Sequence, residues 1–241
     1  MYGSENRLQP ADVLRHAQRA EACTVRSVQS IPPPGLEIER ELFNRGANLI
    51  ACVDEAGRGP LAGGVHVGVV VLHAGHTALT GVDDSKRLSD SSRERLVPLI
   101  QAWAVSAVAA ASASEIDRHG VMGSLRLALR RALAALPSLP DAVVLDGPYD
   151  FLHRPEPVAG EPWTDSIPSV ITLPHGDRLS AGVAAASILA KTSRDAEMRE
   201  LDRSYPGYGW AMNKGYGTSL HKDAIKKLGL TPEHRRTFRL T

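Results

Sequence analysis

The chain has 241 residues, of which 43% are hydrophobic and 23% are charged, and its formal net charge is +1. This composition is typical of one large folded domain, or of one domain with an appendage, and it excludes a global basic excess. Its two cysteines, Cys23 and Cys52, are too few for a disulfide framework or a thiolate metal cluster, and such usage leads us to expect a cytoplasmic protein.

The N-terminal residues 1–35 are polar and end in three consecutive prolines, which predicts a flexible arm with a short helix near 11–22. We expect residues 36–204 to form a catalytic α/β domain. Residues 205–241 are expected to form a basic, aromatic and helical part of the same domain. The N-terminus has no signal pattern, and the uncharged stretch 96–114 is too weakly apolar to predict a membrane span.

Strands and helices are expected to alternate along the chain. Apolar, β-branched runs predict strands at 49–53, 65–72, 102–110, 142–145 and 169–173, the first two as antiparallel partners. Helical spacing and end signals predict helices at 36–45, 91–100, 114–120, 123–136, 178–202 and 219–228. Ser91 and Ser114 are the expected N-caps of two of these helices. Cys52 lies inside the first strand and is expected to be a buried, inert thiol.

Carboxylates follow the predicted strands at three places. Asp54 and Glu55 follow the first strand, Asp146 ends the fourth, and Asp177 lies between the last strand and the long helix. Side chains at strand ends point into the crevice where α/β sheets bind ligands. Each acid alone is an ordinary turn or N-cap residue. Together, however, they would repel one another unless a cation neutralises them.

The chemistry of these acids favours a hard metal ion. Oxygen ligands suit Mg²⁺ or Mn²⁺, and no Cys/His spacing in the sequence resembles a zinc site. Two such ions, held by three or four carboxylates, are the arrangement used for in-line phosphodiester hydrolysis. In the adjoining segment VDEAGRGPLAGG, glycines allow close backbone approach to a ligand, and Arg58 can contact a phosphate. An NTPase phosphate loop would need a lysine after the glycines, whereas a purely structural glycine turn stays an alternative.

Six segments resemble ribonuclease HII in their order along residues 49–238: VDEAGRGPLAGG, DDSKRLS, VVLDG, GDRLSAGVAAASILAKTSRDAEM, NKGYGTSLH and HRRTF. The resemblance implies a ribonuclease H-like mixed β-sheet flanked by helices, with a small C-terminal helical part. It also implies an endonuclease that hydrolyses the RNA strand of RNA/DNA hybrids and cuts 5′ of ribonucleotides embedded in duplex DNA. The products would carry 3′-OH and 5′-phosphate ends, and the cellular role would be ribonucleotide removal from DNA.

The same resemblance implies the residues of the site. Two Mg²⁺ or Mn²⁺ ions would be held by the catalytic acids Asp54, Glu55, Asp146 and Asp177. The substrate would be bound by Gly57, Arg58, Gly59, Lys86, Thr192, Ser193, Arg194 and Tyr216. Within this set, the loop 57–59 would meet the ribose 2′-OH at the junction, and Tyr216 would stack on the sugar that follows. Asp195 also matches a family motif and is interpreted as structural.

The tail has seven Lys and Arg residues against two acids between positions 205 and 241. Its basic side chains are expected to follow the duplex backbone: Lys214, Lys222, Lys226, Lys227, Arg235 and Arg236. The aromatic residues Tyr205, Tyr208 and Trp210 are expected to pack within the protein. The chain departs from the family pattern at Gly64, His175 and Asn213, which puts substrate affinity and metal preference in question.

The expected partners are an RNA/DNA hybrid and ribonucleotide-containing duplex DNA, with no membrane, and the chain is expected to be monomeric. The nearest alternative is a ribonuclease HIII-like hybrid nuclease, which normally carries a substrate-binding domain before the shared core. A transposase or Holliday-junction nuclease on the same fold would lack the glycine–arginine–glycine loop. A catalytically impaired duplex-binding relative would not need the four acids.

Overall fold

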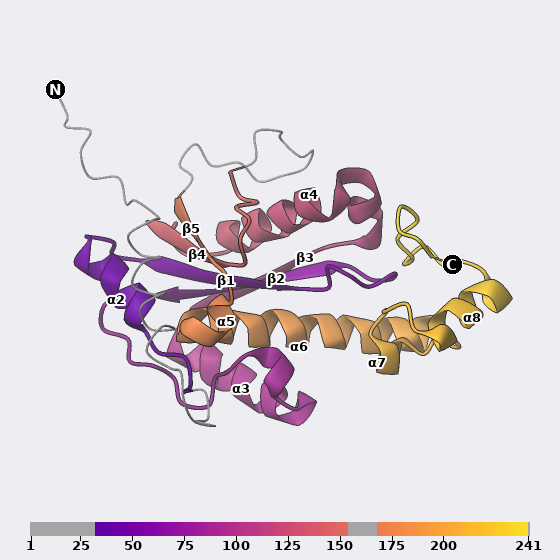
Figure 1. The fold of residues 1–241 in the computed structure, drawn as a ribbon, viewed down its shortest axis with the longest axis horizontal. Helices are drawn as coiled ribbons and strands as arrows, with labels where there is room; N and C mark the ends of the chain where they lie inside the picture. The colour runs from indigo at the N-terminus through magenta and orange to yellow at the C-terminus, as the bar shows by residue number, and fades with distance from the viewer. Residues whose placement is uncertain (1–31, 154–167, 241) are drawn as a thin grey trace, which may run out of the picture.

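The computed structural model describes residues 32–153 and 168–240 (Figure 1). The helix expected near 11–22 and most of the proline-rich segment 149–166 lie outside these residues. Within them, no helix is long and apolar enough to cross a membrane.

The centre of the molecule is a five-stranded mixed sheet in the order β3-β2-β1-β4-β5. Its strands are β1 (Ile50–Ala56), β2 (Val65–Leu72), β3 (Val105–Ala111), β4 (Ala142–Asp146) and β5 (Ser169–Leu173). The pairs β1–β2 and β2–β3 are antiparallel, whereas β1–β4 and β4–β5 are parallel. The α/β class, the mixed sheet and the antiparallel pairing of the first two strands are therefore confirmed.

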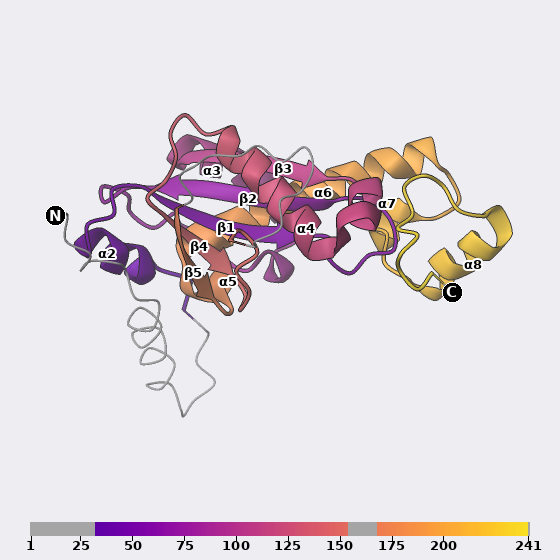
Figure 2. The same cartoon turned by 90° about the horizontal axis from the view of Figure 1, so that it is seen from above.

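Helices cover both faces of this sheet (Figures 1 and 2). The helices are α2 (Glu37–Asn44), α3 (Asp90–Trp103), α4 (Ala113–Ala134), α5 (Gly176–Leu179), α6 (Ala181–Ser204), α7 (Trp210–Asn213) and α8 (Ser219–Leu228). A short 3₁₀ helix, η1, spans Ser85–Arg87. Helix α4 packs on one face against β2 and β3, while α6 packs on the other against β1 and β2. Figure 1 shows α6 running from α5 beneath the sheet to α7, so it joins the sheet to the C-terminal part.

Two helix starts differ from the sequence prediction, because runs of serine offer alternative caps. Ser89, rather than Ser91, caps α3 and accepts a hydrogen bond from the Ser92 N–H at 3.2 Å. Ser112, rather than Ser114, caps α4 and forms a full capping box with Glu115. The helix α3 also continues through Trp103, so β3 starts three residues later than the predicted position 102.

The predicted continuity of the other helices is confirmed in one case and differs in another. The helices expected at 114–120 and 123–136 both fall within α4, and Gly120 interrupts α4 with non-helical dihedral angles (φ 69°, ψ 170°), so the predicted stop near Gly120 is present. The long helix expected from residue 178 is instead divided into α5 and α6. Ser180 lies between them in an extended conformation, and its hydroxyl accepts from the Val183 N–H at 3.0 Å. This break separates Asp177, in the first turn of α5, from the long helix that anchors it.

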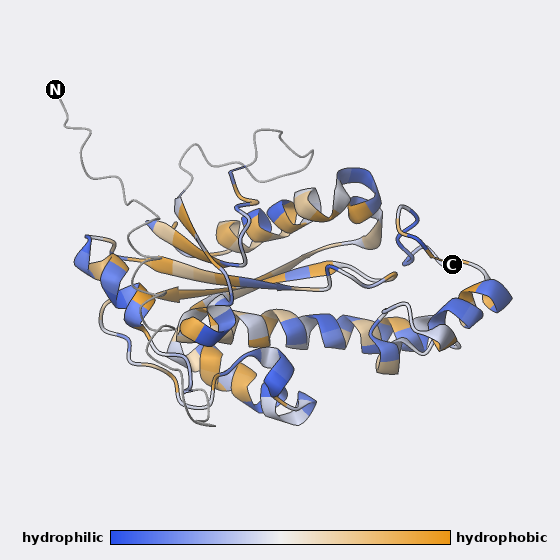
Figure 3. Ribbon diagram, viewed as in Figure 1, coloured by the Kyte–Doolittle hydropathy of each residue, from blue (hydrophilic) through white to orange (hydrophobic). Residues whose placement is uncertain are grey.

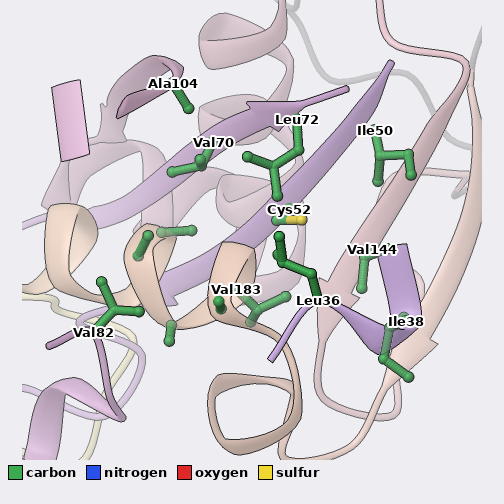
Figure 4. Close-up of a cluster of buried hydrophobic side chains, with 14 of the residues drawn as sticks. Leu36, Ile38, Ile50, Cys52, Val70, Leu72, Val82, Ala104, Val144 and Val183 are labelled. Atoms are coloured by element: carbon green, nitrogen blue, oxygen red, sulfur yellow. The ribbon is translucent and has the colours of Figure 1, made fainter. Parts of the chain in front are cut away.

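The core lies on both sides of the sheet, and Figure 3 shows the strands as mainly hydrophobic. On the α6 side, Cys52, Val70 and Val183 are buried together, as Figure 4 shows. Cys52 is fully buried, which confirms the sequence prediction. Helix α6 lies very close to this face, because a Cβ atom on Gly68 would come within 2.3 Å of the Ala186 carbonyl oxygen. Close packing of this kind holds β2 rigidly against α6 at Gly68, the residue that pairs with Asp54 of β1.

A separate apolar cluster unites the C-terminal part with the segment that follows β1. It contains Leu61, Ala62, Met198, Tyr208, Trp210 and Ile225, with Tyr205 packed against it. Trp210 is fully buried and stacks on Tyr208 at a ring-centroid distance of 5.0 Å. The predicted packing role of these aromatic residues is therefore confirmed.

Candidate active site

Three carboxylates from distant parts of the chain converge at one edge of the sheet. Val53 of β1 lies opposite Leu145 of the parallel strand β4, so Asp54 and Asp146 follow at the same strand ends. Asp177 comes from the first turn of α5. One carboxylate oxygen of each of these three acids lies within 4.8 Å of the other two. The proximity expected from the strand-end positions is therefore present.

The backbone between the acids is tied together locally. The Gly176 N–H donates to Asp146 Oδ1 at 2.7 Å, and the Gly147 N–H donates to the Leu173 carbonyl at 3.0 Å. These bonds join the ends of β4 and β5 to the start of α5. His175, where the sequence departs from the family, adopts the left-handed conformation with φ of 58° directly before this helix. The tight turn at His175 brings Asp177 back toward Asp146.

The electrostatics of this acidic cluster favour bound cations. Burial raises the pKa of Asp54 well above its ordinary value, and the charges of Glu55 and Asp146 raise it further. Burial and Asp146 also raise the pKa of Asp177. Neighbouring negative charges make it unfavourable for all of these carboxyl groups to be ionised at once, and a bound divalent cation removes that penalty. Carboxylate oxygens are also the ligands that hard divalent cations take. The donor set thus fits Mg²⁺ or Mn²⁺.

Glu55 borders this cluster rather than joining it. Its Oε1 atom accepts a hydrogen bond from Arg58 Nη1 at 3.0 Å, whereas Oε2 is buried with no hydrogen-bond partner among the described residues. Burial raises the pKa of Glu55, and Arg58 opposes that shift. The fourth expected acid is therefore adjacent to the group of three and is paired with the arginine of the glycine loop.

Lys86 lies on the other side of the acidic cluster. Its Nζ is 3.4 Å from Asp177 Oδ2 and 3.7 Å from Asp84 Oδ1, yet its side chain is 77% exposed. Asp84 is itself buried, and its Oδ1 accepts from the Lys86 N–H at 2.9 Å. The sequence reasoning did not single out Asp84, although the doubled acid in DDSK was a visible signal. Asp84 holds the turn that presents the exposed lysine beside Asp177.

A cavity of about 360 Å³ opens next to these acids. Its lining is Asp54, Glu55, Ala56, Gly57, Arg58, Gly59, Pro60, Ser85, Lys86, Asp146, Lys191, Arg194, Lys214 and Tyr216. The cavity therefore joins carboxylates, the glycine loop and several cations. Lys191, which the sequence reasoning missed, is one of these cations, and it is also 2.5 Å from the buried Asp195. Asp195 contacts Arg93 as well, which agrees with its structural interpretation.

The glycine loop and Tyr216 lie side by side in the wall of this cavity. A Cβ atom on Gly59 would lie 3.7 Å from Tyr216 Cε1, and Tyr216 is 51% exposed. Gly57 has φ of 96°, and a Cβ atom there would lie 2.4 Å from Arg194 Nε. Glycine is thus required at position 57 both by the backbone conformation and by packing.

The loop that carries Tyr216 is held from behind by polar side chains. His221 Nδ1 is 2.9 Å from the Tyr216 carbonyl oxygen, and Trp210 Nε1 donates to His221 Nε2 at 2.9 Å. Burial lowers the pKa of His221, so the neutral ring that these bonds require is favoured. Asn213, a departure from the family pattern, donates to the Tyr208 carbonyl at 2.8 Å and accepts from the Gly215 N–H at 2.8 Å. Asn213 therefore shapes the turn before Tyr216.

Three predicted substrate contacts are directed toward the protein itself. Arg194 is buried and donates to the Ala62 carbonyl at 2.8 Å, and its guanidinium pairs with Glu197 at 2.8 Å. Ser193 Oγ lies 3.0 Å from His66 Nδ1, and Thr192 Oγ1 is buried with no hydrogen-bond partner in the part of the chain that the structure describes. This arrangement favours a bracing role for Arg194 and Ser193 over the expected phosphate contacts.

Arg235 corrects the prediction for the basic tail. It was expected to follow a duplex backbone, but its side chain is fully buried and donates to carbonyl oxygens of the glycine-rich segment. Sequence reasoning counted it as a surface cation because charge in a tail is usually solvated. The neighbouring Arg236 is exposed, as was expected.

Glu39 is another buried group that sequence reasoning missed, because helix α2 precedes the recognisable motifs. Its Oε1 accepts from Ser180 Oγ, from the Gly182 N–H at 3.3 Å and from Cys52 Sγ at 3.5 Å. Burial raises the pKa of Glu39. This carboxyl group therefore links β1, which carries Asp54, to the helix junction that follows Asp177.

Solved structures share this arrangement of strands and helices. A ribonuclease H2 from Pyrococcus horikoshii superimposes with a TM-score of 0.64 and 27% identity, covering 80% of this chain and 94% of that one. A Bst-RNase HIII in complex with Mn²⁺ gives a TM-score of 0.64 at 23% identity, which shows the fold alone. With carboxylates gathered at the ends of its parallel strands, the chain is a nuclease of the ribonuclease H class.

Sequence comparison defines the family within that class. A model of the ribonuclease HII family matches residues 51–241. A ribonuclease HII of Ruegeria sp. is 42% identical over 211 residues, covering 86% of this chain and 84% of the relative. One from Thermus thermophilus is 45% identical over 197 residues, covering 81% and 89%. The chain belongs to the ribonuclease HII family, and it is therefore a ribonuclease H endonuclease, for which the acidic cluster indicates dependence on a divalent cation.

Proposed function

We propose that this enzyme hydrolyses the RNA strand of RNA/DNA hybrids and also cuts on the 5′ side of single ribonucleotides embedded in duplex DNA. The products carry 3′-OH and 5′-phosphate ends, and the reaction serves the removal of ribonucleotides from DNA. The observation that supports this proposal is the shared cavity. Its wall holds Asp54, Glu55 and Asp146 at one place, and the glycine loop and Tyr216 lie side by side at another.

The acidic cluster is the proposed binding site for two Mg²⁺ or Mn²⁺ ions. Asp54, Asp146 and Asp177 would hold them, and Glu55 borders the same site, where the charge of Asp146 acts on it. When bound, such ions supply activation of a water molecule and stabilisation of the leaving 3′ oxygen. The carboxylates set the positions of the ions, and β1, β4 and α5 keep those carboxylates fixed.

The remaining cavity residues are proposed to bind and orient the substrate. The glycine loop 57–59 can approach a sugar closely, and the 2′-OH is the group that distinguishes ribose from deoxyribose. Tyr216 offers a ring face for the next sugar. Lys86, Lys191 and Lys214 supply positive charge for the phosphates around the scissile bond.

A set of four duplexes tests this function. One sequence is prepared as all-DNA, as DNA with one ribonucleotide, as DNA with four consecutive ribonucleotides and as an RNA/DNA hybrid, each labelled at one 5′ end. With Mg²⁺, we expect cleavage of every duplex that contains ribose, a cut 5′ of the single ribonucleotide, and no cleavage of all-DNA.

The other outcomes separate the alternatives. Cleavage of the hybrid without cleavage at a single ribonucleotide would favour a ribonuclease HIII-like hybrid nuclease. Binding of all four duplexes without any cleavage would indicate a catalytically impaired relative and would contradict the proposal.

A further inference from the structure

Arg235 is fully buried behind the glycine-rich segment, where its guanidinium group contacts four backbone carbonyls. Nη2 donates to the carbonyl oxygens of Gly57 at 2.6 Å and Gly64 at 2.9 Å. Nη1 donates to that of Arg58 at 3.0 Å, and Nε donates to that of Gly63 at 2.9 Å. One side chain thus joins the beginning of the loop, at residues 57 and 58, to its end, at residues 63 and 64.

These contacts determine where the loop's amide groups point. A trans peptide unit is planar, so its N–H is directed opposite to its C=O. Since the carbonyls of Gly57 and Arg58 are directed at Arg235, the N–H groups of Arg58 and Gly59 face away from it. Arg58 and Gly59 line the cavity, whereas Arg235 is absent from the described lining. The two amide donors are therefore directed to the cavity side of the loop.

The guanidinium group is suited to this task for a chemical reason. Arginine offers five N–H donors in a rigid fork, whereas lysine offers three donors on one flexible ammonium group. A lysine at position 235 cannot reach both ends of the loop with the same geometry. The Phe238 ring, 5.2 Å from the guanidinium carbon, packs against Arg235 and restricts its movement.

The same segment is connected to the turn that carries Tyr216. The Leu61 N–H donates to the Gly215 carbonyl at 2.8 Å, and the Arg235 N–H donates to the Leu61 carbonyl at 2.8 Å. Arg194 adds a second guanidinium brace, with bonds to the carbonyls of Ala62 at 2.8 Å and Lys214 at 3.3 Å. The two walls of the cavity that face the sugars therefore share one buried framework.

We propose that Arg235 is a positioning residue for the glycine loop: it aims the loop's amides at the substrate, and so controls the cleavage rate at a ribonucleotide without contributing to duplex affinity. The inference rests on the proposed function, in which this loop meets the ribose 2′-OH. It reverses the role expected of Arg235 from its place in the basic tail, because the side chain acts on the protein's own backbone.

The test compares Arg235→Lys with Arg40→Lys, a matched control in which an exposed arginine of α2, paired with Glu37 and without a role in the site, is changed in the same way. Each variant is assayed for single-turnover cleavage of a duplex with one ribonucleotide and for binding to the all-DNA duplex of the same sequence. Amide hydrogen exchange of residues 56–64 and the melting-temperature increase caused by Mg²⁺ are measured on the same samples. Phe238→Leu serves as a milder variant that loosens Arg235 without removing it.

We expect Arg235→Lys to slow single-turnover cleavage by about 10- to 100-fold, since displacing a bound substrate by about 1 Å from its reactive position costs on the order of 100-fold in rate. Binding to the all-DNA duplex and the response to Mg²⁺ should not change, while exchange of the loop amides becomes faster. Phe238→Leu should show a smaller loss of rate in the same direction. In Arg40→Lys the cleavage rate and the loop exchange should stay as in the wild type.

Two results from Arg235→Lys would overturn the inference. One is a folded Arg235→Lys protein that cleaves at the wild-type rate. The other is a loss of rate that is accompanied by an equal loss of the Mg²⁺ response, which would mean that Arg235 acts through the acidic cluster. If Arg235→Lys does not fold, wild-type loop exchange in Phe238→Leu overturns it as well. A wild-type enzyme that does not cut at a ribonucleotide would instead refute the proposed function, so the two failures are distinguishable.

Discussion

Replacement of Asp54 by asparagine should stabilise the metal-free protein while abolishing cleavage. The substitution keeps the shape of the side chain, and the amide oxygen can still accept the hydrogen bond that the Glu55 N–H donates to Asp54 Oδ1 at 2.7 Å. It removes one negative charge from a group whose carboxylate oxygens lie within 4.8 Å of one another. Repulsion between these acids is therefore relieved when no cation is bound.

The magnitude follows from the distance. Two unit charges 4.8 Å apart repel by roughly 3 kcal/mol at an effective dielectric constant of about 20. Partial protonation of the acids and the ammonium group of Lys86, 3.4 Å from Asp177, reduce this repulsion. We therefore expect a gain of about 2 kcal/mol in the free energy of unfolding, or roughly 4–8 °C in melting temperature for a chain of this size.

The pH dependence has a definite sign. The pKa of Asp54 is raised in the folded state, so the protein is stabilised relative to the unfolded chain at low pH and loses this stability as pH rises. The advantage of Asp54→Asn should consequently be largest at neutral to alkaline pH and should fade below about pH 4. Adding Mg²⁺ should stabilise the wild type more than the variant, because the ion binds the native site.

Thermal melts in EDTA and in Mg²⁺, at several pH values, measure this effect, and a cleavage assay on the same samples measures activity. Asp141→Asn is the control, because Asp141 accepts from the N–H groups of Asn48 at 2.7 Å and Leu49 at 3.0 Å, and these bonds lower its pKa. That variant should not raise the melting temperature. An Asp54→Asn protein that melts below the wild type in EDTA at pH 8 would refute the reasoning.

Other expectations concern the substrate, the acidic site and the fold. Tyr216→Ala should slow cleavage at a single ribonucleotide far more than it weakens duplex binding, since stacking on a ring contributes about 1–3 kcal/mol. If the variant's single-turnover rate equals that of the wild type, Tyr216 is a packing residue. With Mg²⁺, the cleavage rate should rise from pH 6 to 9, because the acids with raised pKa must lose protons to bind metal. A cleavage rate that falls steadily over this range while the protein stays folded would contradict this expectation. Glu39→Leu should weaken the Mg²⁺-induced rise in melting temperature. Glu39→Gln should preserve that rise, because the amide oxygen can still accept the hydrogen bonds that link β1 to the α5–α6 junction. Equal effects of the two substitutions would refute that linkage. Arg131 lowers the pKa of Glu115 to about 2, so this ion pair stabilises the fold above about pH 4.5 and loses its contribution as the pH falls toward 2. Glu115→Gln should therefore lower the melting temperature at pH 7 but not near pH 2. Calorimetry at the two pH values measures this difference.

Much of the fold and of the acidic site could be predicted because short local patterns determine them. Apolar, β-branched runs identified the five strands and the antiparallel pairing of the first two. The position of Asp54 and Asp146 at strand ends then made their proximity an expectation of topology. The metal roles of these acids and the substrate roles of the loop stay predictions, since they depend on groups that bind from outside the chain.

What could not be predicted depends on contacts between residues far apart in sequence. Nothing local distinguishes the buried Arg235 from the exposed Arg236, because only the folded loop supplies the carbonyls that satisfy the former. Glu39 likewise reads as a surface residue of an amphipathic helix until Ser180 and Cys52 are brought to it. The break at Ser180 was hidden by the strong helical propensity of the alanine-rich run that follows.

The central claim is that the acidic cluster binds the metal ions required for cleavage. Anomalous diffraction tests it most directly, using crystals of the wild-type enzyme with Mn²⁺ and a duplex that carries an uncleavable ribonucleotide junction. We expect two manganese peaks about 4 Å apart, coordinated by Asp54, Asp146 and Asp177, with the scissile phosphate between them. Manganese bound elsewhere on the protein, with the three carboxylates free of metal beside a bound duplex, would contradict the account.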